Sequence, residues 1–274
     1  EEQNLFFLNN YNLIKFVMFL GNYYLKKLIF FTIFSSFVLS IATASELDAE
    51  SKIEIKASDK LEWDQLKNKI VAYGDSVVKS SFFSINANEI IGFYEGQIGQ
   101  GKIQRLIANE NAVFKTSQII INSNSMNYDL VKETLLVKGD NISLLSNFGT
   151  AYSQNSLLYD RIEKKIILDG NVLIKLKNPE TSINANKLII KIDENEKITS
   201  VKAIEKVEVK IDSLEQNISS DTAELFNIDQ KINFEGNVII KQNESFLKGN
   251  NAVIDFKKGL SSMTSNEQNS VTGV

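Results

Sequence analysis

Apolar and polar residues alternate in short runs along most of the chain after Ser51. The stretch Ser58–Lys79 shows the pattern: Leu61 and Trp63 lie in a first apolar run, a polar turn follows, and Ile70–Tyr73 form a second run. Period-two alternation on both sides of a polar turn is typical of a β-hairpin with one buried face. Helical periodicity is almost absent from this region, so the sequence predicts an all-β chain.

The Ser58–Lys79 pattern recurs along the sequence. Its copies are Leu61-x-Trp63-Asp64, Met126-x-Tyr128-Asp129, Leu157-x-Tyr159-Asp160 and Phe226-x-Ile228-Asp229, with a fainter one at Ala252-x-Ile254-Asp255. A glycine follows the first three Asp residues after 10 positions, at Gly74, Gly139 and Gly170. Gly236 follows Asp229 after only 7 positions, which predicts a tighter turn in that unit.

Two more units lack the Asp but keep the first strand. They are the near-identical stretches Ile85–Asn88 and Ile183–Asn186, and longer polar connections follow at Gly96–Gly101 and Asp193–Lys197. The units recur with a mean spacing near 32 residues. Such a period predicts a repeat architecture in which no unit buries its apolar face alone.

The strands after the glycines show which side chains face inward. In Gly170–Lys175, Val172 and Ile174 share one face, and Gly236–Lys241 repeats the pattern. The Gly-Asn and Gly-Asp pairs predict sharp bends between strands, because glycine adopts positive φ without a Cβ clash. The stretch Gly139–Leu144 shifts its apolar positions by one residue, which predicts a bulge or a register change.

The N-terminal part reads as a targeting segment. Lys26 and Lys27 precede the apolar run Leu28–Leu39, and Ala42-Thr43-Ala44 has the small-x-small form of a cleavage site. We expect translation to start near Met18 and cleavage after Ala44; the alternative keeps the apolar run as a membrane anchor. Both interpretations place the rest of the chain outside the cytoplasm.

Three segments follow from these patterns. Residues 1–44 form a leader and signal peptide, residues 45–260 a β repeat domain, and residues 261–274 a polar tail that we expect to be disordered. The single proline, Pro179, suggests a boundary between two pseudo-repeats near residues 178–180.

The amino-acid composition argues against several classes of function. The segment after residue 44 carries 27 basic and 32 acidic residues, a net charge of −5, which argues against nucleic-acid binding. The 274 residues include no cysteine and no histidine, so the usual zinc sites, disulfides and the commonest general base are missing. No cluster of catalytic residue types stands out, and we expect no enzyme activity, metal site or cofactor.

The recurring Asp64, Asp129, Asp160 and Asp229 allow two interpretations. They could form a carboxylate ladder for Ca²⁺, as in some β-solenoids. Alternatively each Asp caps a turn through its own backbone. The glycine-rich nonapeptide spacing of calcium solenoids is absent, which favours turn caps.

Several motifs follow one another in a characteristic order over roughly Ser51–Lys257. The leader is followed by Ile55–Asp64 with Ala72–Val77, by Ile85–Asn88, and by Ser125–Asp129 with Gly139-Asp140. In these motifs and their order, the sequence resembles the OstA-like family of lipopolysaccharide transport proteins. The resemblance implies an open, twisted β-jellyroll, a stack of V-shaped antiparallel turns whose apolar interior holds lipid acyl chains. The chain is longer than a usual bridge protein of this family, which leaves open a duplicated form or the N-terminal part of an outer-membrane assembly protein.

The resemblance also implies a function and partners. The protein would be a periplasmic carrier of lipopolysaccharide that bridges the inner- and outer-membrane transport components as a head-to-tail homo-oligomer. The inward residues that would line its lipid groove are Ile55, Val78, Ile85, Val172, Ile174, Ile183, Val238 and Ile240. Two alternatives remain: a structural β-solenoid of the adhesin type, whose interior is packed shut, and a membrane-anchored paralogue of the same pathway.

Overall fold

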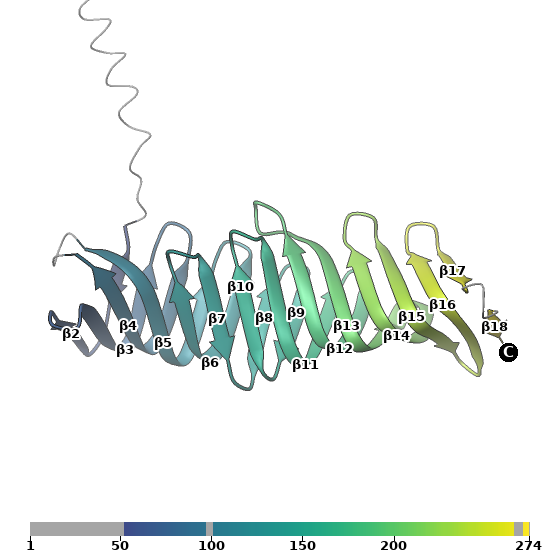
Figure 1. The fold of residues 1–274 in the computed structure, drawn as a ribbon, viewed down its shortest axis with the longest axis horizontal. Coiled ribbons are helices and arrows are strands. Elements are labelled where there is room, and N and C mark those ends of the chain that lie inside the picture. Colours follow the sequence, from purple (N-terminus) through teal and green to yellow (C-terminus); the bar gives the residue numbers. More distant parts are fainter. Residues whose placement is uncertain (1–51, 97–100, 266–270, 274) are drawn as a thin grey trace, which may run out of the picture. The chain divides into compact units, whose positions relative to one another are not determined.

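The structure is a computed structural model, and it describes residues 52–96, 101–265 and 271–273. The described residues form 18 β-strands and one short 3₁₀ helix, Asp212–Leu214. Figure 1 shows the strands side by side in two layers, one in front and a fainter one behind. The leader, with its expected cleavage site after Ala44, lies outside the described residues. None of the helical structure that is described is long and apolar enough to cross a membrane.

The strands fall into long ones of 11 to 14 residues and short ones. The long strands are β3 (Lys69–Lys79), β4 (Ser84–Glu95), β5 (Lys102–Lys115), β6 (Ile119–Asp129), β11 (Lys165–Lys177), β12 (Glu180–Ile192), β13 (Ile198–Ile211), β14 (Gln216–Phe226), β15 (Lys231–Gln242) and β16 (Ser245–Asp255). The short strands are β1 (Glu54–Lys56), β2 (Lys60–Asp64), β7 (Thr134–Lys138), β8 (Ile142–Ser146), β9 (Gly149–Ser153), β10 (Ser156–Asp160), β17 (Leu260–Thr264) and β18 (Thr272–Gly273).

Every described pairing is antiparallel, and most join strands that follow each other in sequence. The exceptions occur where a short strand replaces half of a long one. Thus β6 pairs with both β7 and β8, and β11 pairs with both β9 and β10. Pairs of short strands therefore continue the stack where one long strand would otherwise stand. The expected all-β class is confirmed.

The long strands bend at a corner, where the register of each pairing shifts. The shift lies between Tyr73 and Ser76 in β3 and between Asp169 and Val172 in β11, for example. The corners divide the stack into two arms. The first arm comprises residues 60–64, 69–73, 89–95, 102–109, 125–129, 134–138, 156–160, 165–169, 187–192, 198–204, 222–226, 231–235, 251–255 and 260–264. The second arm comprises residues 54–56, 76–79, 84–86, 112–115, 119–123, 142–146, 149–153, 172–177, 180–184, 207–211, 216–219, 238–242, 245–249 and 272–273.

The corners correct one expectation about the glycine pairs. Gly74-Asp75, Gly170-Asn171 and Gly236-Asn237 all have positive φ, but they lie inside β3, β11 and β15 rather than between strands. Two residues in the left-handed region bend the strand sharply while it continues into the other arm. β5 and β13 bend in the same way at Glu110-Asn111 and Glu205-Lys206, which contain no glycine.

The shifted third unit has a physical explanation. Three residues, Gly139, Asp140 and Asn141, stand at its corner instead of two, and the strand is broken there into β7 and β8. Gly139 and Asn141 have φ of 117° and 61°. The extra residue moves Ile142 and Leu144 back onto the buried face, as the shifted pattern predicted.

The hairpin turns at the outer end of the first arm confirm the turn-cap interpretation of the repeated Asp. The Asp64, Asp129, Asp160 and Asp255 carboxylates each accept a hydrogen bond from the backbone N–H three residues ahead, at 2.9 to 3.1 Å. Such a local bond holds the chain in the turn.

Asp229 does not belong to this series. Phe226 pairs with Lys231 as Asp160 pairs with Lys165, so Phe226 occupies the repeat position that Asp fills elsewhere. Counted from Phe226, Gly236 follows after 10 residues as in the other units. The predicted tighter turn was therefore wrong, because the Asp motif was aligned three residues out of register.

The inner faces of both arms meet in one hydrophobic cluster that runs through the stack. Most of its members are less than 5% exposed. Part of the segment expected to be a disordered tail continues the sheet: β17 pairs with β16, and Thr272 and Gly273 pair with Lys248 and Leu247.

Candidate functional site

The interior of the second arm carries a row of side chains that runs from β1 to β16. Each member is the register partner of the next, so the row crosses every strand of the arm. Its members are Ile55, Val78, Ile85, Phe114, Ile121, Leu144, Ala151, Ile174, Ile183, Val209, Ile218, Ile240 and Leu247. All of them are apolar.

All eight predicted groove residues belong to the second arm. Six lie in the row just described: Ile55, Val78, Ile85, Ile174, Ile183 and Ile240. Val172 and Val238 lie two residues nearer the corner on the same face, where Ala185 and Gly249 are their partners. Seven of the eight are at most 4% exposed, and Ile55 packs against the cluster while partly buried.

The sequence prediction missed the facing wall on the first arm. On the first arm, a row of register partners runs along the stack on the side nearer the hairpin turns. Its members are Trp63, Ile70, Gly92, Leu106, Tyr128, Leu135, Tyr159, Ile166, Ile190, Val201, Leu225, Ile232 and Ile254. Alternation is weak in these segments because outward positions such as Ile167 and Ile189 are apolar too. Counting back in steps of two from the corners that glycine marks would have found part of the row, such as Ile70, Ile166 and Ile232.

The two arms face each other across a mouth between their hairpin turns. A cavity of about 570 Å³ lies in this mouth. Residues 81–83 and 116–118 of the second-arm turns line one side, and residues 161, 164 and 193–196 of the first-arm turns line the other. A second cavity of about 300 Å³ follows along the mouth, and Gln118 and Glu196 line both.

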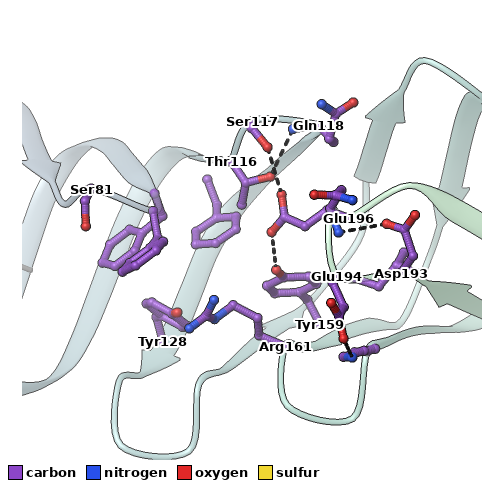
Figure 2. A pocket seen from close by; sticks show the side chains of 16 residues that line it. Ser81, Thr116, Ser117, Gln118, Tyr128, Tyr159, Arg161, Asp193, Glu194 and Glu196 are labelled. Carbon is purple, nitrogen blue, oxygen red and sulfur yellow. Dashed lines mark hydrogen bonds and ion pairs between the residues drawn. The ribbon is translucent and has the colours of Figure 1, made fainter. Parts of the chain in front are cut away.

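Two side-chain contacts cross the mouth. Ser117 Oγ donates a hydrogen bond of 3.4 Å to Glu196 Oε2, joining the turns of the two arms. The Arg161 guanidinium lies over the Phe82 ring, with 5.0 Å from Cζ to the ring centroid. Figure 2 shows Glu196 between Tyr159 and Ser117, with Arg161 reaching along the floor of the cavity.

The two first-arm residues that make these contacts, Glu196 and Arg161, are each also hydrogen-bonded to a residue of their own arm. The Tyr159 hydroxyl donates a hydrogen bond of 2.6 Å to Glu196 Oε1. Arg161 makes two parallel bonds to Glu133, from Nε at 2.8 Å and from Nη2 at 3.0 Å. This paired geometry with a carboxylate fixes the guanidinium plane, and the hydrogen bonding to Glu133 raises the pKa of Arg161.

The floor of the larger cavity is aromatic. Phe83, Phe114, Tyr128 and Tyr159 contact one another with ring centroids 4.9 to 5.8 Å apart, in edge-to-face, tilted and stacked pairs. Burial raises the pKa of Tyr128 to about 12. Burial, reinforced by the neighbouring Glu196, also raises the pKa of Tyr159, so its hydroxyl remains a donor at neutral pH.

Chemically, the site offers apolar surface with a polar rim. No group of His, Cys, Asp or Glu side chains within the described segments is arranged to hold a metal ion. The four capping Asp carboxylates bind their own turns. The arrangement suits non-covalent binding of an amphiphile.

Comparisons with known proteins find similarity over part of the chain. Residues 217–273, which span most of β14 through β18, match the family model described as "LptA/(LptD N-terminal domain) LPS transport protein". Among solved structures, the chain is similar to LptH, the LptA-homologous periplasmic component of the lipopolysaccharide transport device from Pseudomonas aeruginosa, with 18% identity and a TM-score of 0.35 over 41% of this chain and 78% of LptH. No curated protein matches the sequence. The family match supports the resemblance to OstA-like proteins of lipopolysaccharide transport.

Proposed function

We propose that the protein is a periplasmic lipopolysaccharide-binding transport protein that carries lipid acyl chains between its two arms. The observation that carries the proposal is the unbroken apolar row along the second arm, faced by apolar rows on the first arm. A lipid could move along these rows without meeting a polar barrier.

The energetics fit a carrier. Each methylene moved from water into an apolar interior gains about 0.8 kcal/mol, so several acyl chains are held without any charged binding site. Passage along equivalent rows changes this energy little from one repeat to the next. The process needs no covalent step and no cofactor.

The ends of the stack support the bridging role. Leu61 and Trp63 of β2 are 49% and 45% exposed, and Leu247 at the other end is 43% exposed. Within the described residues, β1 and β2 pair only with β3, and β17 and β18 only with β16. Terminal strands that end apolar rows suit head-to-tail strand addition, by a second copy or by transport components of the inner and outer membranes.

Photo-crosslinking tests the proposal. A small diazirine-bearing aliphatic residue replaces Ile174, which is 1% exposed on the inner face, so that overpacking is avoided. The same residue at Lys175, the next position on β11 and exposed outward, is the matched control. We expect lipopolysaccharide to crosslink at position 174 and not at 175.

One observation favours a second candidate, the closed β-solenoid. Interior residues such as Val78, Ile85 and Leu168 are 0% exposed, as in a packed core. A folded protein that crosslinks lipid at neither position 174 nor 175 would support this structural role and reject the carrier.

A further inference from the structure

The interior rows are buried, so a lipid that enters from the side must pass between the arms. The mouth is the direct route, because the larger of its two cavities is lined by the interior aromatic rings. Their volumes, about 570 and 300 Å³, are within or near the range of about 300–1,000 Å³ that is usual for small-molecule sites.

Glu196 and Gln118 lie between these cavities, since both residues line both of them. Of the two, Glu196 belongs to the first arm, and its carboxylate reaches Ser117 on the opposite arm.

The Ser117–Glu196 hydrogen bond across the mouth is the weaker of the two hydrogen bonds that the Glu196 carboxylate accepts. At 3.4 Å, the bond from Ser117 is longer than the roughly 2.5–3.0 Å of a good O–H···O bond. By contrast, the bond from Tyr159, on the same arm as Glu196, is 2.6 Å. Opening therefore breaks the bond between the arms and keeps Glu196 attached to its own arm.

The turn that presents Glu196 is built to hold it in place. Asp193 Oδ1 accepts hydrogen bonds from the backbone N–H groups of Asn195 and Lys197, at 2.8 and 2.9 Å. Lys164 pairs with Glu194 at 3.1 Å and ties the turn to the neighbouring one. Glu196 itself has a φ of 60°, in the left-handed region.

We propose that the two mouth cavities form a side entrance for one hydrocarbon chain of an amphiphile, and that the Glu196–Ser117 contact is its latch. The chain would lie on the Phe83, Phe114 and Tyr128 rings while the polar head group stays at the rim. This inference rests on the proposed lipid-carrier function.

A reversible crosslink tests the latch. The chain has no cysteine, so Ser117→Cys/Glu196→Cys places the only two thiols on the two sides of the mouth. A short bis-methanethiosulfonate reagent links them, and reduction frees them. The control Asn184→Cys/Glu208→Cys joins two exposed register partners within the second arm and leaves the mouth free.

The readout is the rate at which full-length protein takes up fluorescent lipopolysaccharide. We expect the linked mouth variant to load about tenfold more slowly than after reduction, because a closed latch raises the barrier to loading. The linked control should load as fast as its reduced form. Equal rates for the linked and reduced mouth variant, with uptake by the wild type, would overturn the latch alone. No uptake by the wild type would overturn the carrier function and the latch with it.

A single substitution gives an independent check. Glu196→Ala removes the carboxylate that contacts Ser117, without any reagent, and should speed loading of lipopolysaccharide. Glu208→Ala makes the same charge change on the exposed face of the second arm and should not. Equal loading rates for the two variants would contradict the assignment of Glu196.

Discussion

The interior of the stack differs between its two halves. From β3 to β10 it contains the contacting rings Phe83, Phe114, Tyr128 and Tyr159. From β11 to β16 the buried hydrophobic residues are aliphatic except for Phe234. Aliphatic side chains fill the space between two sheets completely, whereas a tyrosine hydroxyl must find a polar partner. The larger mouth cavity is lined by both of these tyrosines.

The largest loss of stability should come from removing a ring in the aromatic half. Phe114→Ala removes a ring that is 1% exposed and contacts three other rings, and it should lower the free energy of unfolding by about 3–5 kcal/mol. In the aliphatic half, Ile183→Val in the same row should cost only about 0.5–1.5 kcal/mol. Urea unfolding measures both, and a loss for Phe114→Ala no larger than that for Ile183→Val would contradict tight packing of the ring cluster.

Corner glycines should give the next largest effect. A Cβ at Gly170, where φ is 86°, would lie 2.5 Å from Asn155 Cβ, so Gly170→Ala should cost about 2 kcal/mol. Gly139, at the broken corner, has nothing within 4 Å of such a Cβ, and Gly139→Ala should cost about 1 kcal/mol, for its positive φ alone. Thermal or urea unfolding compares the two variants, and a larger loss at Gly139 would contradict this account.

The buried tyrosines should make stability depend on alkaline pH. The pKa of Tyr128 is raised to about 12, and that of Tyr159 is raised further, whereas an unfolded tyrosine titrates near pH 10. The unfolded state therefore loses these protons first. Their contribution to stability should be constant below about pH 10 and fall as pH rises towards 12, by about 1 kcal/mol for each tyrosine at pH 11. Tyr128→Phe/Tyr159→Phe should reduce the slope of unfolding free energy against pH; an unchanged slope would assign it to other groups.

The smallest effect should come from the turns. Asp160→Ala removes the hydrogen bond that the Glu163 backbone N–H donates, and should cost about 0.5–1 kcal/mol. Asp160→Asn keeps an acceptor and should recover most of the loss. Chemical denaturation compares the three proteins, and a full loss in the Asn variant would indicate that charge rather than hydrogen bonding stabilises the turn.

Much of the local structure could be predicted from the sequence. Alternation gave the hairpins, and the Asp residues at 64, 129, 160 and 255 marked turns that they do cap. The corners were found only where glycine marked them, because Glu110-Asn111 and Glu205-Lys206 adopt the same positive φ without a glycine signal. Asp229 misled the register because Phe226 had replaced the Asp of that repeat.

The groove prediction found one wall and missed the other. Six of its eight residues form a single row across the second arm, since alternation fixes which side chains share a face. Alternation within one strand cannot show which row on another segment faces these six residues.

The sequence by itself determined an all-β repeat, the inward face of strands in the second arm and the capped turns, because these depend on residues within a few positions of one another. Only the tertiary structure decided that two arms close over a common interior and that Ser117 meets Glu196 across the mouth. Those two residues are 79 positions apart, and the folding of the stack at its corners brings them together.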